Sequence, residues 1–268
     1  MRKKAVDMAK ALGCSHVGLG GYTSIVAQSG LALHHSDINI TTGNALTAGA
    51  SLMSTLEVAK TKHTGPKTIG VIGAGGNVAA TLCKLLADML GPEDELILFS
   101  RNAQGAKHLE DFAKQLTCRV SVEPELTNLQ RCNLIFSASN ASNPLIFEHH
   151  IQSENTIVCD IAVPPDVARC AQEKAHVLRG GRIKLPHNQS LGLLAGTDTQ
   201  AHIFACMAET ILLGLENRTG HFSYGAIEPD KVKEILQLAD KHGFEIQSSQ
   251  NLSVFQINYP ESKKYECV

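Results

Sequence analysis

Short apolar runs alternate with helix-length polar stretches through the middle of the chain. Six runs have the length of strands: Thr68–Ile72, Glu95–Phe99, Val120–Val122, Asn133–Ser137, Thr156–Asp160 and His176–Leu178. The stretches Asn77–Leu90 and Ala103–Leu116, which lie between strands, have the length of helices. Strands that alternate with helices are typical of βαβ units and a parallel sheet. The pattern predicts a Rossmann-like α/β domain over residues 66–196.

Helical spacing replaces this alternation on both sides. Before the sheet region, Asn44 is expected to cap a helix that runs to about Lys62, and the stretch His63–Lys67, which contains Gly65 and Pro66, marks a domain boundary. A second helix is expected from Pro229 to Lys241, ending at Gly243.

A third helix is expected after residue 196. Its cap would be one of Thr197, Asp198 and Thr199, and its apolar positions are Ile203, Met207, Ile211 and Leu215. The alternation at Ser253–Ile257 is typical of a strand. We expect residues 1–65 and 197–268 to form a second, smaller and mostly helical lobe that is built from both ends of the chain.

Composition excludes several classes of protein. The chain has 268 residues, with 24 basic and 26 acidic side chains and a formal charge of -2, which gives no support for nucleic-acid binding. No apolar run approaches the roughly 20 residues that a membrane span needs. The eight cysteines form no CxxC pair, and Asp7 and Lys10 interrupt what would be a signal peptide. We therefore expect a soluble globular protein of the cytoplasm.

A glycine-rich turn follows the first predicted strand and opens the first helix of the sheet region. Its candidate cofactor-binding residues are Gly73, Gly75, Gly76, Asn77, Val78 and Ala79. Glycines let backbone N–H groups approach a pyrophosphate, and the helix N-terminus adds partial positive charge. The spacing fits GxxGxxA, with Ala79 as the small residue that packs the helix on the strand. The turn predicts a dinucleotide site.

The second strand indicates which dinucleotide is bound. It ends in Ser100, Arg101 and Asn102, with no carboxylate for the ribose hydroxyls of NAD. A guanidinium and two hydrogen-bonding side chains suit the 2′-phosphate of NADP. Ser137 and Ala138, at the end of the fourth strand, are further candidates. The sequence thus favours NADP(H).

Other chemistries receive less support. No HExxH or GxSxG motif is present, and the pairs His34–His35 and His149–His150 lack the spacing of metal ligands, so we expect no metal. By helical spacing Cys206 shares a face with Ile203, Met207 and Thr210, as a small core residue does.

Seven motifs in one order resemble the cyanobacterial long-chain acyl-(acyl-carrier-protein) reductases. They are Leu19–Ile25, Thr41–Asn44 with Thr47 and Ala48, Gly73–Ala79, Ser100–Asn102, Phe204–Glu209, Phe222–Gly225 and His242–Phe244. The family's N-terminal region of several dozen residues has no counterpart here. Its histidine falls on Thr219, with His221 close by, and Tyr224 replaces its tryptophan.

This resemblance implies an enzyme that uses NADPH to reduce an acyl thioester to an aldehyde, with acyl carrier protein or coenzyme A as the carrier. It implies that Cys206 is the nucleophile that carries the acyl group, and the cation that would lower the pKa of its thiol is His202 or His221. The candidate substrate residues are Gly21, Tyr22, Thr23, Ser24, Thr42, Asn44, His221 and Tyr224. Asn44, besides capping its helix, is expected to present N–H groups to a developing oxyanion. The alternatives are a shikimate- or amino-acid-dehydrogenase-like enzyme without a covalent step and a non-catalytic nucleotide-binding module.

Overall fold

The computed structural model describes residues 2–33, 38–100, 102–189, 191 and 201–246. The chain divides into two compact units. We call Ser54–Gly180 the sheet unit, and Met1–Met53 together with Gly181–Gln247 the split unit. Helix α3 (Asn44–Lys62) begins in the split unit and ends in the sheet unit.

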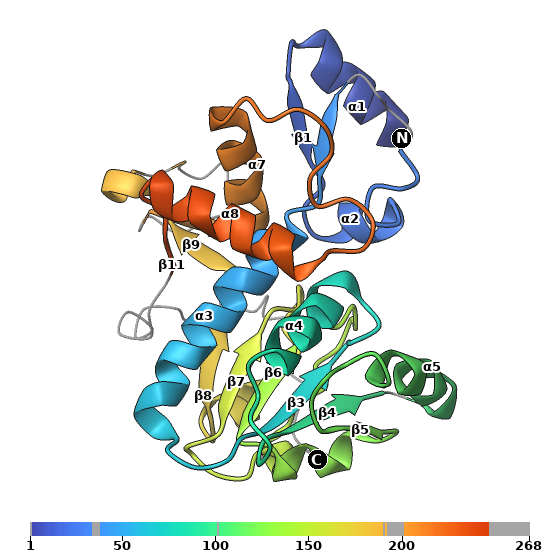
Figure 1. Cartoon of the computed structure of the whole chain (residues 1–268), viewed down its shortest axis with the longest axis vertical. Helices are drawn as coiled ribbons and strands as arrows, with labels where there is room; N and C mark the ends of the chain where they lie inside the picture. The colour runs from blue at the N-terminus through green and yellow to red at the C-terminus, as the bar shows by residue number, and fades with distance from the viewer. Residues whose placement is uncertain (1, 34–37, 101, 190, 192–200, 247–268) are drawn as a thin grey trace. The chain divides into compact units, whose positions relative to one another are not determined.

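The sheet unit contains a six-stranded parallel sheet (Figure 1). Its strands are β3 (Thr68–Ile72), β4 (Glu95–Phe99), β5 (Val120–Glu123), β6 (Leu134–Ser137), β7 (Ile157–Asp160) and β8 (His176–Arg179). The spatial order is β5-β4-β3-β6-β7-β8, which is the order of a doubly wound Rossmann sheet. The predicted fold class is confirmed, and each predicted strand agrees with the structure within one residue.

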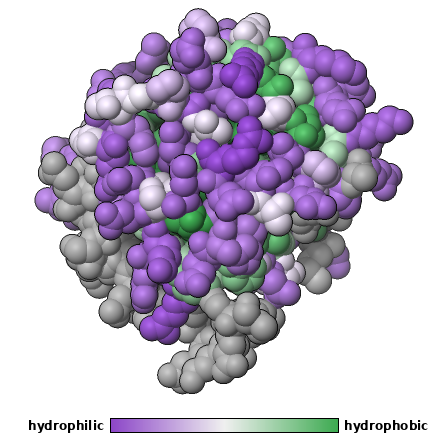
Figure 2. Space-filling model, turned by 90° about the horizontal axis from the view of Figure 1, so that it is seen from below, coloured by the Kyte–Doolittle hydropathy of each residue, from purple (hydrophilic) through white to green (hydrophobic). Residues whose placement is uncertain are grey.

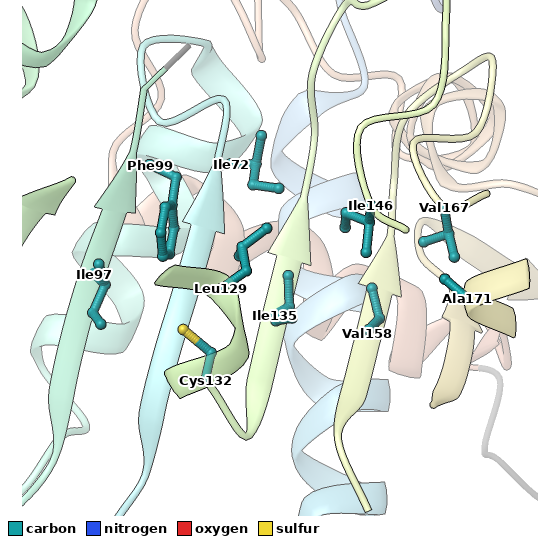
Figure 3. Close-up of a cluster of buried hydrophobic side chains, with 10 residues drawn as sticks. All are labelled: Ile72, Ile97, Phe99, Leu129, Cys132, Ile135, Ile146, Val158, Val167 and Ala171. Carbon is teal, nitrogen blue, oxygen red and sulfur yellow. The ribbon is translucent and has the colours of Figure 1, made fainter. Parts of the chain in front are cut away.

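Helices and short 3-10 turns connect these strands. They are α4 (Asn77–Ala87), α5 (Ala103–Ala113), η1 (Leu126–Arg131), η2 (Glu148–His150) and α6 (Arg169–Gln172). Side chains from several elements form one buried cluster, which Figure 3 displays: Ile72, Ile97, Phe99, Leu129, Cys132, Ile135, Ile146, Val158, Val167 and Ala171. Strands buried on both faces read as continuous apolar runs, which is why the sequence located them well.

The split unit combines helices with two small sheets. Its first segment holds α1 (Arg2–Ala11), β1 (His16–Gly18), α2 (Tyr22–Val26) and β2 (Asn39–Thr41), and β1 pairs with β2 in parallel. Its second segment holds β9 (Arg182–Lys184), η3 (Pro186–Asn188), β10 (His202–Phe204), α7 (Ala205–Leu215), α8 (Pro229–Lys241) and β11 (Glu245–Ile246). Strand β9 lies between β10 and β11 and is antiparallel to both.

One expectation for this unit needs correction. The helix predicted to include Ile203 begins only at Ala205, because Ile203 lies in β10 and pairs with Ile183. The described part of the unit is mostly helical, as expected, and its strands have only two or three residues, too few for a periodic signal. Helices α3 and α8 have the predicted bounds, and Gly243 has the left-handed φ of 71° expected after a helix.

The boundaries between the two compact units differ from the boundaries of the predicted segments 1–65, 66–196 and 197–268. The last turns of α3 belong to the sheet unit, and the chain leaves the sheet unit at Gly180, before β9. The predicted caps Thr197, Asp198 and Thr199, the predicted strand Ser253–Ile257 and the pair His34–His35 lie outside the described residues.

The surface is mostly hydrophilic on the face shown in Figure 2, with smaller apolar areas between the polar side chains. Among the described helices, none combines the length and the apolar character needed to cross a bilayer. The described residues include no group of three or more histidine, cysteine or acidic side chains placed to hold a metal ion.

Candidate functional site

The glycine turn joins β3 to α4 at the centre of the sheet. Gly73 has a φ of 86°, in the region that favours glycine, and its carbonyl accepts a hydrogen bond of 2.8 Å from the Gly76 N–H. Gly76 precedes the first residue of α4, and both Gly75 and Gly76 are exposed. A Cβ added at Gly75 would have no described atom within 4 Å. The start of α4 is therefore open to a ligand.

The turn lies at the point where the strand order reverses. Strand β3 pairs with both β4 and β6, and ligands of doubly wound sheets bind where the order switches. A Cβ added at Gly73 would lie 2.6 Å from the Ala138 carbonyl oxygen, so the backbone after β6 packs directly on the turn. The structure thus brings together the predicted cofactor residues at Gly73–Ala79 and those at Ser137 and Ala138. Ala79 is buried, as expected of the residue that packs the helix on the strand.

The residues after β4 make local contacts. Asn102 caps α5 by accepting a hydrogen bond of 2.8 Å from the Gly105 N–H, and the Ser100 hydroxyl donates to the Asn102 carbonyl at 2.8 Å. Arg101, the residue on which the choice of NADP over NAD depends, lies outside the described residues.

A buried carboxylate after β7 organises the loop that follows β6. Asp166 is fully buried and accepts hydrogen bonds from the Ser137 hydroxyl (2.6 Å), the Ser139 hydroxyl (2.7 Å) and the Ser139 N–H (3.1 Å). Because Ser139 directly follows Ala138, Asp166 fixes the backbone that packs on Gly73. The sequence pattern did not single out Asp166. The local feature that could have indicated it is an acidic side chain shortly after a strand, at the carboxyl edge of the sheet.

Asp160, the last residue of β7, is a second buried carboxylate at this edge. It accepts hydrogen bonds from the N–H groups of Ala162, Asp166 and Val167, and its carboxylate lies 3.3 Å from Nη1 of Arg179. Burial raises the pKa of the Asp160 carboxyl to about 6, against the opposing effects of Arg179 and the N–H groups.

Cys206 is the second residue of α7, not a mid-helix position. The sequence placed it on one face with Ile203, but β10 ends at Phe204 and the helix starts at Ala205. The cysteine is half-buried, and a Cβ added at Gly20 would lie 3.3 Å from its sulfur. Gly43, with a φ of 73°, also packs on it, since an added Cβ there would overlap the Cα and Cβ of Cys206.

Backbone donors, not a cation, oppose the effect of burial on this thiol. Burial raises the pKa of Cys206, while hydrogen bonding by the N–H groups of Met207 and Gly21 lowers it and the nearby Glu209 raises it further. The sequence suggested His202 or His221 as the activating cation. His202 instead lies buried in β10, and His221 Nδ1 accepts a hydrogen bond of 3.1 Å from the Ile40 N–H.

Four predicted substrate residues lie at the start of α2. Gly21 precedes the helix and directs its N–H toward the Cys206 sulfur. Tyr22 is 50% exposed, Ser24 is buried, and the Thr23 hydroxyl donates to the Gly20 carbonyl at 2.6 Å. Of these, the structure places Gly21 against Cys206.

The prediction that Asn44 caps its helix needs correction. Asn44 is the first residue of α3, and side chains distant in sequence cap that helix: Ser223 Oγ accepts from the Ala45 N–H (3.2 Å) and Glu209 Oε2 from the Leu46 N–H (2.8 Å). These two N–H groups are therefore occupied, and the oxyanion role of Asn44 stays a prediction. Thr42 is also engaged, since its N–H and hydroxyl both donate to the Ser223 carbonyl.

His221 and Tyr224 lie in the segment between α7 and α8. Their rings stack, with centroids 4.4 Å apart and planes 21° apart. Tyr224 also packs beside the cluster of Val6, Leu19, Ala27, Leu33, Ile38 and Ile40. Because Nδ1 of His221 is an acceptor, its neutral ring carries the proton on Nε2.

Comparison with known proteins gives one partial family match. Residues 56–179 match the model of the shikimate / quinate 5-dehydrogenase family, and this range lies within the sheet unit. Among solved structures, the chain is similar to the Thermococcus litoralis Δ1-pyrroline-2-carboxylate reductase, with 17% identity and a TM-score of 0.41 over 78% of this chain and 69% of that one.

Two curated relatives match most of the chain. It is 30% identical over 241 residues to aminotransferase PigE of a Serratia species, which covers 87% of this chain but 28% of that protein. It is 25% identical over 257 residues to the long-chain acyl-[acyl-carrier-protein] reductase of Synechococcus elongatus, which covers 90% of this chain and 74% of that protein. The chain thus spans little more than a quarter of the first relative's length.

Proposed function

We propose that the protein is an NADP(H)-dependent oxidoreductase that reduces an acyl thioester to an aldehyde through an acyl group carried on Cys206. The observation that carries this proposal is the setting of Cys206. The cysteine lies at the start of α7, with the N–H groups of Gly21 and Met207 directed at its sulfur and the backbone of Gly43 packed against it. Helix N-termini and backbone donors stabilise a thiolate, which is the nucleophilic form.

The residues of the glycine turn fit a dinucleotide. Gly73 has the positive φ that the tight turn needs, Gly75 faces open space, and α4 begins directly after Gly76, so its N-terminus lies at the turn where a pyrophosphate would bind. When bound, the dinucleotide supplies a hydride. The choice of NADP over NAD depends on Arg101 and comes from the sequence alone.

Cys206 divides the reduction into two steps. Its sulfur attacks the thioester carbonyl carbon, a new carbon–sulfur bond forms, and the donor leaves as a thiol with the proton from Cys206. Addition of hydride and one proton to the enzyme-bound carbonyl gives a hemithioacetal on Cys206. Cleavage of its carbon–sulfur bond releases the aldehyde and restores the thiol.

The acyl substrate is supported by similarity to the cyanobacterial reductase along most of the chain. The motifs that resemble this family include the residues that lie around the sulfur, at Gly20–Gly21, Gly43 and Cys206. By the same similarity, we propose an acyl carrier protein or coenzyme A as the carrier of the substrate.

A dehydrogenase that acts without a covalent step is the second candidate, because residues 56–179 match the shikimate / quinate 5-dehydrogenase family. That match ends before β9 and does not reach Cys206. It therefore supports the dinucleotide half of the proposal and leaves the chemistry at Cys206 to be tested.

Intact mass spectrometry tests the covalent step. We expect the wild-type protein, mixed with acyl thioesters without NADPH, to gain the mass of one acyl group. Cys206→Ser should keep its melting temperature and NADPH binding but lose both acylation and aldehyde formation. If the serine variant forms aldehyde at a comparable rate, Cys206 is a packing residue and the non-covalent dehydrogenase is the better assignment.

The choice of dinucleotide has a separate test. Arg101→Ala should weaken NADPH binding about 10- to 150-fold, since a charge-assisted contact contributes about 1.5–3 kcal/mol. NADH binding should change little because NADH lacks the 2′-phosphate. Equal losses for both dinucleotides, measured by titration, would contradict the assignment to NADP.

A further inference from the structure

Glu209 is a completely buried acidic residue one helical turn after Cys206. Its carboxylate accepts hydrogen bonds from the Leu46 N–H (2.8 Å) and the Thr41 hydroxyl. Burial raises the pKa of the Glu209 carboxyl, and hydrogen bonding by Ser223 and Thr41 lowers it. One side chain of α7 therefore contacts the segment from β2 to α3, which lies far away in sequence, and the segment after α7.

Hydrogen-bond donors favour the ionised form of this carboxyl group, against burial, which raises its pKa. The Thr41 hydroxyl oxygen accepts a hydrogen bond from the Ser223 N–H (3.2 Å), and the Ser223 hydroxyl oxygen accepts one from the Ala45 N–H (3.2 Å). Each hydroxyl proton is therefore left to donate to Glu209. A carboxylate accepts at all its lone-pair sites, whereas a protonated carboxyl would need an acceptor here.

The same hydrogen bonds hold the backbone that touches Cys206. The Gly43 N–H donates to the Thr41 hydroxyl oxygen at 3.4 Å, and that hydroxyl donates to Glu209. An added Cβ at Gly43 would overlap the Cα and Cβ of Cys206. Leu46, the third residue of α3, is bound to the other carboxylate oxygen. The turn at Gly43 cannot move away from the cysteine without breaking contacts to a buried charge.

A buried carboxylate is costly, and the fold offsets the cost locally. The N-terminus of α3 brings partial positive charge to the Glu209 oxygens, and the Leu46 N–H and the Thr41 hydroxyl replace lost water. An apolar residue in this helix would avoid the cost, which suggests that the charge has a role beyond packing.

We propose that Glu209 is the positioning residue of Cys206: its carboxylate holds the turn at Gly43 against the cysteine, and its negative charge opposes ionisation of the thiol. Residues three apart on a helix share a face, so the carboxylate and the sulfur lie in the same low-dielectric surroundings. Burial and Glu209 together raise the pKa of Cys206, against the N–H groups of Met207 and Gly21. The resting enzyme thus carries a thiol, and the N–H donors offset only part of the rise in its pKa.

The other described elements packed on Cys206 contribute little charge. The segments Gly18–Gly21 and Thr41–Asn44 contain no ionisable side chain. In the segment after α7, Arg218 pairs with Glu234 at 2.5 Å, and His221 Nδ1 is bound to the Ile40 N–H. Glu209 is the side-chain charge that acts on the thiol among the described groups.

The pH dependence of Cys206 alkylation tests the proposal. The full-length protein is treated with iodoacetamide across a pH series, and the rate at Cys206 is followed by peptide mass spectrometry, so that the other cysteines do not interfere. In Glu209→Gln the amide oxygen can still accept from Leu46 while the charge is lost. We expect the alkylation midpoint of this variant to fall by about one pH unit.

Two matched variants separate the effect of the Glu209 charge from the effect of the geometry of the turn at Gly43. Thr41→Val removes one donor to Glu209 and loosens the turn but keeps the charge, so its midpoint should not fall. Glu216→Gln removes a charge at the other end of α7, where Glu216 binds Lys241 and His242, and should leave the midpoint unchanged. An equal fall in Thr41→Val and Glu209→Gln, or no fall in Glu209→Gln, overturns the proposal.

The wild-type protein gives a second measurement if Glu209→Gln does not fold. The proposal requires its Cys206 midpoint to lie above the ordinary thiol value of about 8.5, and a lower midpoint overturns it. The inference rests on the proposed function, but the two can be refuted separately, because the alkylation experiment needs neither NADPH nor thioester. A protein that no thioester acylates would contradict the proposed function and still yield these midpoints.

Discussion

At the scale of single residues, glycines at close backbone contacts define both candidate sites, the turn after β3 and the surroundings of Cys206. Gly43 packs on Cys206 and Gly73 packs on Ala138, each with a positive φ and no room for a Cβ. Gly75 differs, because its φ is ordinary and an added Cβ meets no described atom. The first two glycines are required by the fold, whereas Gly75 is free to serve a ligand.

Substitution of two turn glycines by alanine should separate these roles. Gly73→Ala should lower the free energy of unfolding by about 1–3 kcal/mol, because the methyl group meets the Ala138 carbonyl and the backbone conformation is unfavourable. Gly75→Ala should change stability by less than about 0.5 kcal/mol but weaken dinucleotide binding. Urea unfolding and fluorescence titration of NADPH measure the two effects. Unchanged affinity in Gly75→Ala would contradict a dinucleotide site at this turn.

At the scale of helices, strands and loops, two acidic residues organise the loops at the carboxyl edge of the sheet. Asp166 holds the loop after β6, and Asp160 holds the loop after β7 through three N–H groups and faces Arg179. The loop after β6 packs on the glycine turn, so the position of the cofactor residues depends on carboxylates that do not belong to the turn.

The buried carboxyl of Asp160 predicts an unusual dependence of stability on pH. Its pKa of about 6 lies above the ordinary value, so between pH of about 4 and 6 the folded protein holds a proton that the unfolded chain has lost. The contribution of Asp160 to stability should therefore fall by about 2–3 kcal/mol as pH rises through this range. The difference in unfolding free energy between wild type and Asp160→Asn, measured in urea from about pH 4 to 7, isolates this group. A difference that grows in favour of the wild type with rising pH would contradict the prediction.

At the scale of the whole molecule, the residues proposed for dinucleotide binding and those proposed for acyl transfer belong to different units. The glycine turn belongs to the sheet unit, and Cys206 with its surrounding glycines belongs to the split unit. Each site is formed from contacts within its own unit, so damage to one need not disturb the other.

Variants of one unit should therefore leave the other half-reaction intact. Gly76→Val should lose NADPH binding but still gain one acyl group from a thioester, whereas Cys206→Ser should bind NADPH normally and gain none. Mass spectrometry and NADPH titration on the same preparations provide the measurements. Loss of acylation in a folded Gly76→Val protein would show that the two functions depend on each other.

The sequence by itself determined the sheet, its flanking helices and the glycine turn. Buried parallel strands are continuous apolar runs, and the turn needs glycine for steric reasons, so both leave local signals. The resemblance to a family added Cys206 and the segments around it. The start of α7 was misplaced because β10 has three residues and directly precedes the helix.

Tertiary structure alone decided how the residues around Cys206 are held. The cap of α3 comes from Ser223 and Glu209, more than 160 positions away along the chain, and no local pattern at Asn44 reveals such partners. The buried contacts of Asp160 and Asp166 were equally hidden. An acidic residue in a sequence is ordinarily exposed, and only packing determines which carboxylates are buried and which donors they hold in place.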